Sequence, residues 1–432
     1  MATQLGLCWT HAASRSRPRG HALSVETTFD VAVVGGGPVG AVLGALLRQG
    51  PTPRRVLLLE RELPDLAVSS NAPDLRVFAL SRASERILRT AGAWNSLLIA
   101  ASAMCAYERM HVWPRDAEPR GEGSLTFDAA ELGEPDLGAI VGNDALQRAG
   151  LNAFLASGGE ARAALVSDVV FHDRVVELTT SIGVFSAKLV VGADGGRSIV
   201  RRAAGFSVEA QEYGQLALVA NVTSERAHES TAWQRFLGEG TLALLPLANG
   251  QSSLVWSLPR ERAEGLLAAD VSAFNEALTT ASAGVLGRLS LASERRSFPL
   301  RRVSAPQYVR ERCALVGDAA HIIHPLAGQG VNLGLLDAAA LAEQLDEAAR
   351  EREDPGALRV LRRYERWRKS DNEVMSLAMD LLNRFLAFGG DGAEQWLQRG
   401  LGFVGRSAVL RRPFAERALG LAGDLPAIAR RG

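Results

Sequence analysis

A glycine-rich turn between an apolar run and a helix-forming run constrains the fold of this chain most. Residues 29–34 have the pattern of a buried strand, and a helical pattern runs from about residue 38 to residue 47. Between them lies a G-x-G-x-x-G sequence with Gly35, Gly37 and Gly40 at its fixed positions. In such a unit the glycines make the turn, admit a pyrophosphate to the backbone and let helix and strand pack closely. The free N–H groups of the helix N-terminus then favour the bound anion.

An acidic residue lies where a dinucleotide site requires one. Residues 56–59 form a second buried-strand pattern, and Glu60 follows it directly, twenty residues beyond Gly40. A carboxylate at this place accepts hydrogen bonds from an adenosine ribose. The alternative is a glycine-rich turn that binds nothing. The two flanking elements and Glu60 favour dinucleotide binding.

Two further motifs combine glycine and aspartate after strand-like runs. Asp194 and Gly195 lie in G-A-D-G-G-R-S at residues 192–198, and Gly317 and Asp318 begin G-D-A-A-H at residues 317–321. Each motif alone is compatible with an Asx turn that caps a helix. The later motif continues into a loop and a helix start that carry Pro325, Gly328, Gly330, Val331 and Asn332.

Together and in this order, the three motifs resemble the fingerprints of the class A flavoprotein aromatic hydroxylases. The resemblance implies that the dinucleotide is FAD and that Asp194 and Gly195 belong to a segment that also takes part in NAD(P)H binding. It implies that Asp318 holds the ribityl chain of the flavin. The backbone of Pro325 and Gly328 is expected near the flavin ring, followed by contacts from Gly330, Val331 and Asn332. A helix N-terminus near residue 331 would stabilise negative charge on the reduced flavin.

Other stretches narrow the resemblance to the ubiquinone-biosynthesis hydroxylases. These stretches are D-L-R-V-F-A-L-S at residues 74–81, L-G-A-I-V-G-N at 137–143, and A-W-Q-R-F-L at 232–237 with the strands that follow to residue 258. By this resemblance Arg76, Asn143 and Gln147 contact the FAD. A helix cap for Asn143 and a surface position for Gln147 remain alternatives. Residues 233–258 are either sheet core or, by the resemblance, the wall of the substrate pocket.

The implied fold class is α/β, with a Rossmann-like FAD-binding domain, an interleaved β-sheet substrate domain and a C-terminal helical region, as in para-hydroxybenzoate hydroxylase. We expect residues 29–205 to form the first part of the FAD-binding domain, including a substrate-side excursion near 75–135. Residues 206–295 are the expected substrate domain, 296–350 the second part of the FAD-binding domain, and 351–432 the helical region. The asparagine-glycine pair at residues 249–250 predicts a hairpin inside the substrate domain.

The resemblance implies a flavin-dependent monooxygenase that uses NAD(P)H and O2 to hydroxylate the aromatic ring of a prenylated phenol in ubiquinone biosynthesis. The hydroxylating reagent forms on the flavin, so we assign no catalytic side chain. One alternative is a hydroxylase of a soluble aromatic acid, which needs a closed pocket with an arginine clamp rather than a long apolar channel. Another is a non-catalytic flavin-binding subunit of a quinone-biosynthesis assembly, and a third is a flavoenzyme that reduces a prenyl chain without O2.

Composition and short patterns exclude other classes of protein. The 48 Lys and Arg residues balance 48 Asp and Glu residues, which argues against a nucleic-acid binder held by counterion release. Three distant cysteines without a C-x-x-C pair support neither a disulfide framework nor a zinc site. His321 and His324 form H-x-x-H, but no third ligand is near in sequence, so no metal site is predicted.

Both ends of the chain carry arginine. Residues 1–28 are rich in arginine and contain no acidic residue before Glu26, which is typical of a disordered extension or, less specifically, of a targeting peptide. Residues 399–432 mix arginine with apolar residues, as in a helix that contacts an anionic membrane or packs on the core. The expected location is the cytoplasm, with peripheral contact at the inner membrane as an alternative, or the mitochondrial matrix in a eukaryote. Partners in a quinone-biosynthesis complex fit the same expectation.

Overall fold

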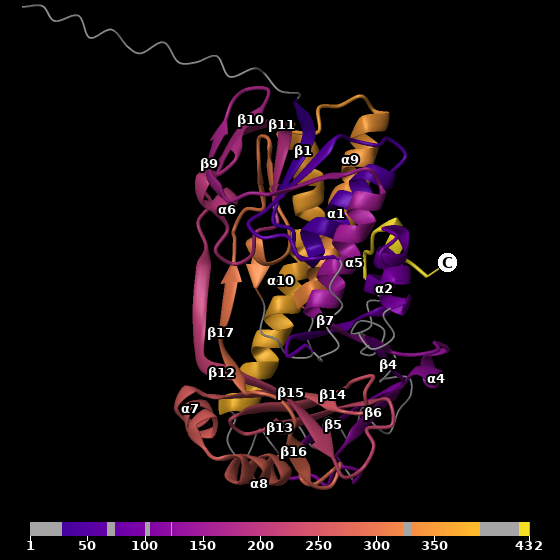
Figure 1. Cartoon of the computed structure of the whole chain (residues 1–432), viewed down its shortest axis with the longest axis vertical. Coiled ribbons are helices and arrows are strands. Elements are labelled where there is room, and N and C mark those ends of the chain that lie inside the picture. The colour runs from indigo at the N-terminus through magenta and orange to yellow at the C-terminus, as the bar shows by residue number, and fades with distance from the viewer. Residues whose placement is uncertain are drawn as a thin grey trace, which may run out of the picture.

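The computed structural model describes residues 28–66, 74–99, 104–121, 123–322, 330–388 and 423–431. Figure 1 shows two sheet-based regions at opposite ends of the long axis, joined by the long strands β12 (Glu209–Ser224) and β17 (Arg296–Ser304) and by the helix α10 (Leu358–Phe388). A third, smaller sheet lies between them. The chain passes from one region to the other more than once, so neither is a continuous stretch of sequence.

The first sheet has a parallel centre. Its central five strands are mutually parallel, and three short strands extend it in antiparallel pairings. Because both faces of a parallel sheet are covered, the strands Phe29–Val34, Val56–Glu60 and Cys313–Leu315 consist almost entirely of apolar residues. In sheet order the parallel strands are β19 (Cys313–Leu315), β11 (Gly183–Gly192), β1 (Phe29–Val34), β2 (Val56–Glu60) and β8 (Glu160–Ala163), and the others are β18 (Val309–Arg310), β9 (Val166–Phe171) and β10 (Val176–Thr180).

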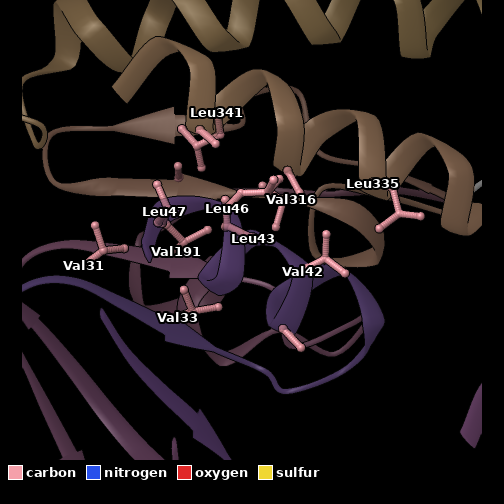
Figure 2. Packing of buried hydrophobic residues seen from close by; sticks show 14 of the residues in the cluster. Val31, Val33, Val42, Leu43, Leu46, Leu47, Val191, Val316, Leu335 and Leu341 are labelled. Atoms are coloured by element: carbon pink, nitrogen blue, oxygen red, sulfur yellow. The ribbon is translucent and has the colours of Figure 1, made fainter. Parts of the chain in front are cut away.

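The helix α1 (Pro38–Gln49) packs against this sheet and carries a further helix on its other side. Figure 2 shows Leu43 and Leu47 of α1 between the strand valines Val31 and Val191 and Leu341 of the helix α9 (Gly330–Arg350). All five side chains are fully buried, and each contributes about 1.5–3 kcal/mol by leaving water. The remaining helices of this region are α2 (Arg82–Thr90), α3 (Trp94–Ile99), α5 (Asn143–Ala156) and α6 (Ile199–Ala203).

The second sheet has two faces with different partners. Trp113, Trp233 and Trp256 lie in a hydrophobic cluster that also holds residues of the helices α7 (Arg260–Ala268) and α8 (Val271–Ala281). The alternation of side chains along each strand turns the intervening residues to the opposite face. In sheet order the strands are β20 (His321–Ile322), β17, β12, β15 (Ser252–Pro259), β14 (Gly240–Pro246), β13 (Thr231–Leu237), β5 (Arg109–Pro114) and β6 (Leu125–Asp128), and β16 (Leu289–Leu291) pairs with β12.

The third sheet is built from the chain between the first two glycine motifs. Its strands are β3 (Val77–Leu80), β7 (Gly138–Gly142) and β4 (Met104–Tyr107), and the short helix α4 (Ala129–Leu132) follows β6. The segment predicted as an excursion thus supplies two strands of this sheet and also β5 and β6 of the second sheet. Gly138 has φ +145°, and a Cβ there would lie 2.0 Å from the carbonyl oxygen of Leu80, so close pairing of β3 and β7 requires glycine.

The observed elements agree closely with the predicted ones, and one boundary differs. The hairpin of β14 and β15 surrounds the predicted turn at residues 249–250, and α9 begins one residue before the predicted start. The second sheet, however, extends past residue 295, because β17 pairs with β12 over most of its length. Three arginines and a proline interrupt the apolar alternation of β17, which hid this strand in the sequence. Residues 1–27, and 399–422 of the predicted tail, lie outside the described residues.

Candidate cofactor and substrate cavity

The three glycine motifs meet because they follow neighbouring parallel strands. Gly35 follows β1, Ala193 follows β11 and Gly317 comes two residues after β19, while Glu60 ends β2. The register pairs Val34 with both Leu59 and Gly192, so these carboxyl ends lie at the same level. In open α/β sheets, ligands bind outside this edge where the strand order reverses. β1, which lies between β2 and β11, marks that point here.

The first motif forms a cradle that side chains would fill. A Cβ on Gly35, which has φ +109°, would lie 2.3 Å from the carbonyl oxygen of Ala193, and one on Gly40 would lie 2.0 Å from that of Gly35. Gly37 has no atom within 4 Å of this position and lines the cavity. No described side chain caps the N-terminus of α1, which begins after Gly37 with Pro38. Its backbone N–H groups are therefore available for a phosphate.

Glu60 and Gln147 both hold this cradle in place. Glu60 Oε2 accepts a hydrogen bond from the N–H of Gly36 at 2.6 Å, and its Oε1 accepts one from Arg61 N at 2.8 Å. Gln147 Nε2 donates to the carbonyl oxygen of Gly36 at 3.1 Å. Both side chains line the cavity. The side chain of Gln147 thus lies at the cavity and contacts the first motif, whereas the sequence had left a surface position as an alternative.

The middle motif is tied to the third one by a buried arginine. Asp194 Oδ2 accepts a hydrogen bond from Ile199 N at 2.6 Å, while its Oδ1 is buried without a hydrogen-bond partner among the described residues. Burial raises the pKa of this carboxyl. Arg201 donates to the carbonyl oxygens of Gly196 at 2.7 Å and of Ala319 at 2.8 Å. Asp194 and Gly195, which has φ +74°, both line the cavity.

The third motif approaches α1 and α9 through glycine. Gly317 has φ +59°, and a Cβ on Gly334 of α9 would lie 2.6 Å from Val39 Cγ2 and 3.2 Å from the Cα of Gly317. Asp318 is exposed between buried neighbours and lines the cavity. The first two residues of α9, Gly330 and Val331, line it as well. The predicted Pro325 and Gly328, together with His324, lie outside the described residues.

Arg76 and Asn143 lie together at the edge of this cavity. The backbone N–H of Asn143 donates to the carbonyl oxygen of Arg76 at 2.9 Å, and both residues line the cavity. Asp74 supports them by accepting from Arg76 N and from Asp144 N, each at 2.9 Å. Asn143 is the first residue of α5 and does not cap it, because the cap position is Gly142.

Asn332 makes other contacts than the predicted one with the flavin. Its Oδ1 accepts hydrogen bonds from Ser81 N at 3.0 Å and Ser84 Oγ at 2.7 Å, and its Nδ2 donates to the carbonyl oxygen of Ala79 at 2.8 Å. The side chain is 2% exposed and is not among the residues that line the cavity. Through these hydrogen bonds the side chain of Asn332 ties the N-terminus of α9 to β3 and α2.

A buried aspartate behind the third motif, Asp337, has contacts that the sequence analysis did not predict. Asp337 accepts hydrogen bonds from Gly317 N at 3.1 Å, His321 Nε2 at 2.6 Å and Arg368 Nε at 3.0 Å. Burial alone would raise its pKa, but His321 and Arg368 favour the charged form and hold the pKa at about 2. Asn372 donates to the same carboxylate at 3.1 Å.

The three glycine motifs, Glu60, Arg76, Asn143 and Gln147 line one cavity of about 1520 Å³. Pockets for a single small ligand measure about 300–1,000 Å³, so this one has room for a dinucleotide and a second molecule. Loops after β1, β2, β11 and β19 line one part, with charged residues that include Glu60, Asp194 and Asp318. We call this part the nucleotide half.

Strands of the second sheet line the other part, which we call the substrate half. Trp233 packs in the cluster under α7 and α8 and also borders the cavity, and its neighbours Gln234 and Phe236 line the cavity too, so residues 233–258 contribute to both a core and a pocket wall. Among the described residues that β5, β6 and β12–β15 contribute to the lining, none is charged: Met110, Val112, Leu125, Phe127, Ala217, Val219, Ala232, Trp233, Gln234, Phe236, Ala243, Leu245 and Val255.

Comparison with known proteins identifies the family. The FAD binding domain family matches residues 162–373. The 3-demethoxyubiquinol 3-hydroxylase of Escherichia coli is 36% identical over 91% of this chain and 98% of its own length. The chain belongs to the family of FAD-dependent ubiquinone-biosynthesis hydroxylases. Other members of similar length are ubiquinone hydroxylase UbiL of Rhodospirillum rubrum, 36% identical over 92% of this chain and 91% of its own, and the human ubiquinone biosynthesis monooxygenase COQ6, mitochondrial, 34% identical over 84% and 86%.

Solved structures support the class A hydroxylase fold. The p-nitrophenol 4-monooxygenase PnpA from Pseudomonas putida covers 91% of this chain with 98% of its own, at 18% identity and a TM-score of 0.70. This member of the hydroxylase family is therefore a flavin-dependent monooxygenase, with FAD as cofactor and NAD(P)H as co-substrate. The glycine cradle and the uncapped N-terminus of α1 fit the FAD pyrophosphate. None of the described helices combines the length and apolar composition that a bilayer crossing requires.

Proposed function

We propose that this enzyme hydroxylates the aromatic ring of a prenylated phenol in ubiquinone biosynthesis. The relatives support this proposal, because three of them, from two bacteria and from human, are named for ubiquinone hydroxylation or ubiquinone biosynthesis. A prenylated phenol needs a long apolar surface for its chain and a small polar contact for its ring. The substrate half of the cavity has this composition.

The uncharged substrate half is the observation that carries the proposal. A soluble aromatic acid needs a cation for its carboxylate, because burying an unpaired charge is very unfavourable. The described lining from β5, β6 and β12–β15 offers none. Arg301 of β17 also lines the cavity, but its Nη2 lies only 3.1 Å from where a Cβ on Gly196 would be, beside the middle motif. This arginine belongs to the nucleotide half.

For the cofactor we propose a set of contacts in the nucleotide half. Gly35, Gly37 and Gly40 with the N-terminus of α1 would hold the pyrophosphate, Glu60 the adenosine ribose, and Asp318 the ribityl chain. Arg76, Asn143, Gln147, Asp194 and Gly195 line the cavity along this path, and Gly330 and Val331, which also line it, would direct the N-terminus of α9 toward the flavin. FAD, when bound, supplies electron transfer from NAD(P)H and the activation of O2. The protein then contributes orientation and an apolar, water-poor substrate half.

The proposal is tested with the purified, FAD-loaded protein and two substrates. A phenol with a short prenyl chain should give a product one oxygen atom heavier, with consumption of NAD(P)H and O2, whereas 4-hydroxybenzoate should give none. Product from the acid alone would identify a hydroxylase of soluble acids. Absence of product from either compound would favour the non-catalytic subunit, and turnover without O2 would favour a prenyl reductase.

Contact with a membrane and with other proteins of the pathway belongs to the same proposal. A prenylated substrate resides in a bilayer, and we propose that the enzyme reaches it at the membrane surface. The predicted contact is the arginine-bearing segment at residues 399–432, of which residues 399–422 lie outside the described residues. Co-sedimentation with anionic vesicles that decreases with salt would support this contact, and equal binding to neutral vesicles would contradict its electrostatic basis.

A further inference from the structure

A single amide interrupts the apolar surface of the substrate half. Gln234 lies on β13, is 6% exposed and lines the cavity. Its cross-strand neighbours in the sheet are Val112 of β5 and Ala243 of β14, which also line the cavity. Among the residues that the structure describes, none makes a hydrogen bond with the side chain of Gln234. A buried amide surrounded by aliphatic side chains on both sides is therefore available to a ligand.

The amide of Gln234 opens into the cavity, since neither its oxygen nor its nitrogen is among the fully buried atoms that lack a hydrogen-bond partner. A ligand that fills the cavity displaces water from this amide, and leaving the amide unpaired would then cost free energy that a hydrogen bond from the ligand avoids. Alternation along β13 also gives Ala232 and Phe236 to the cavity, both apolar, so the strand tolerates such residues here. The presence of glutamine at position 234 thus indicates a function in the cavity.

Two other polar side chains, those of Trp233 and Tyr107, also border the substrate half, but their surroundings differ from those of Gln234. The indole N–H of Trp233 is buried without a partner among the described residues, and the guanidinium of Arg120 lies over its ring, 5.4 Å from the centroid. Trp233 belongs to the cluster under α7 and α8, and its N–H has no access to the cavity. The phenol of Tyr107 on β4 does line the cavity, and burial raises its pKa well above its usual value. It belongs to the third sheet and packs against Gly138 of β7.

We infer that Gln234 is a specificity-determining residue that binds the phenolic oxygen of the substrate ring. The inference rests on the proposed function. A prenylated phenol carries its oxygen on the ring and none on its chain, so the ring belongs where the lining offers a hydrogen bond. Gln234 Oε1 accepts the phenolic O–H, and the Nε2 group donates to a neighbouring ring oxygen when one is present. The apolar residues of β12, β14 and β15 contact the chain.

This assignment predicts how the enzyme rejects analogues. A site that hydrogen-bonds a substrate hydroxyl discriminates strongly against a compound that lacks it, because its own polar group is then left unpaired. The ring is also held in one orientation. If it is not, O2 is reduced without hydroxylation, and NAD(P)H, one proton and O2 give NAD(P)⁺ and H2O2. A loss of orientation therefore appears as H2O2 formed per NAD(P)H oxidised.

The experiment compares a short-chain prenylated phenol with its methyl ether. Dissociation constants are measured on the oxidised, FAD-loaded protein from the change in flavin absorbance, so that binding is separated from turnover. The variants are Gln234→Met, which keeps the shape and removes the amide, and Tyr107→Phe, which removes the other available polar group. Gln307→Met, at an exposed position between β17 and β18, is the matched control.

The wild type should bind the phenol about 10- to 100-fold more tightly than the ether. Gln234→Met should bring this ratio close to one and raise the H2O2 fraction, whereas Gln307→Met and Tyr107→Phe should keep the ratio. An unchanged ratio in Gln234→Met would overturn the inference, and its loss in Tyr107→Phe alone would transfer the role to that residue. If Gln234→Met does not retain FAD, Gln234→Asn, which withdraws the amide by one methylene, should give an intermediate ratio, and a full ratio would also overturn the inference.

The failure of this inference can be told apart from the failure of the proposed function. If the wild type hydroxylates the prenylated phenol but Gln234→Met keeps the ratio, only the role of Gln234 is wrong. If the wild type gives no hydroxylated product from the prenylated phenol, the proposed function is wrong whatever the ratios are.

Discussion

The two halves of the cavity are lined by different parts of the chain. The lining of the nucleotide half includes backbone groups and carboxylates on loops, where glycines such as Gly35 and Gly40 fix the course of the backbone. The lining of the substrate half consists of side chains on regular strands, among them Gln234 and Ala243. We therefore expect the cofactor site to depend on a backbone geometry that tolerates little change. A substrate is selected by strand residues that can change while the sheet hydrogen bonds stay the same.

This difference predicts that the halves fail differently when they are mutated. A change in the nucleotide half should remove FAD, and a change in the substrate half should alter substrate binding while FAD stays bound. The buried aspartate and a helix cap provide two further tests, because each stabilises one region without contacting either ligand.

Among these predictions, the substitution Gly40→Val should have the largest effect, which is a loss of FAD affinity. The Cβ would lie 2.0 Å from the carbonyl oxygen of Gly35, which belongs to the turn itself and cannot move without displacing the cradle. Overpacking of this kind costs about 3 kcal/mol or more, which corresponds to a loss of FAD affinity of more than about 100-fold. The protein should be purified nearly colourless, and the flavin content measured by absorbance gives the result.

Gly265→Ala in α7 is the matched control, since its Cβ would have no atom within 4 Å. This variant should keep its FAD and gain up to about 1 kcal/mol from helix propensity. A Gly40→Val protein with normal flavin content would contradict the close helix–strand approach that the third glycine of the motif provides.

The difference between backbone geometry and side-chain direction also explains why the sequence predicted more of the nucleotide half than of the substrate half. Glycine and aspartate at fixed spacing are required by backbone geometry, so Gly35, Gly317 and Asp318 could be placed before the structure was known. The direction of a side chain depends on the tertiary neighbours instead. The hydrogen bonds that the amide of Asn332 makes with Ala79 and Ser81 therefore could not be predicted from its place in the motif.

Gln234 shows what the sequence contained without revealing it. The pattern W-Q-R-F places Trp233 and Arg235 on one face of β13 and Gln234 and Phe236 on the other. Which face meets a cavity and which meets α7 and α8 follows from the packing of elements distant in sequence. Asp337 was missed for a similar reason, since its partner Arg368 lies on another helix.

Asp337→Asn should have the next largest effect, on the stability of the region behind the third motif. The change leaves Arg368, which is fully buried, without its charged partner at 3.0 Å, although Asp371 still pairs with it. Breaking a buried ion pair from one side costs about 3 kcal/mol or more. The free energy of unfolding of the FAD-loaded protein at pH 7, from urea titration, measures the loss.

The same variant has a predicted pH dependence. The pKa of Asp337 is about 2 in the folded protein against 3.8 for the unperturbed group, so its contribution is complete above about pH 4 and is lost as the pH falls toward 2. The two limits differ by about 2 kcal/mol. The gap between wild type and Asp337→Asn should therefore narrow by about this amount between pH 4 and pH 2. A constant gap across this range would contradict the ion pair as the cause.

Ala243→Leu should weaken substrate binding and leave the cofactor in place. The larger side chain enters the cavity beside Gln234, its partner in the register of β13 and β14. Overpacking of about 1–3 kcal/mol corresponds to an increase of on the order of 10-fold in the KM for the prenylated phenol. Ala268→Leu, at the exposed end of α7, is the control and should keep both the KM and the flavin. Loss of FAD in Ala243→Leu alone would show that the halves are not separable.

The smallest effect is expected from Asp270→Ala, which removes the N-cap of α8. The side chain of Asp270 accepts a hydrogen bond from Ala273 N at 2.8 Å, and its loss costs about 1 kcal/mol. Because α8 covers the face of the second sheet opposite the cavity, the thermal midpoint should fall by a few degrees, while flavin content and KM should not change. Asp270→Asn keeps a capping oxygen and should restore most of the loss. A change in KM for Asp270→Ala would mean that the two faces of the sheet are coupled, and that α8 helps to shape the substrate half through Trp233 and its cluster.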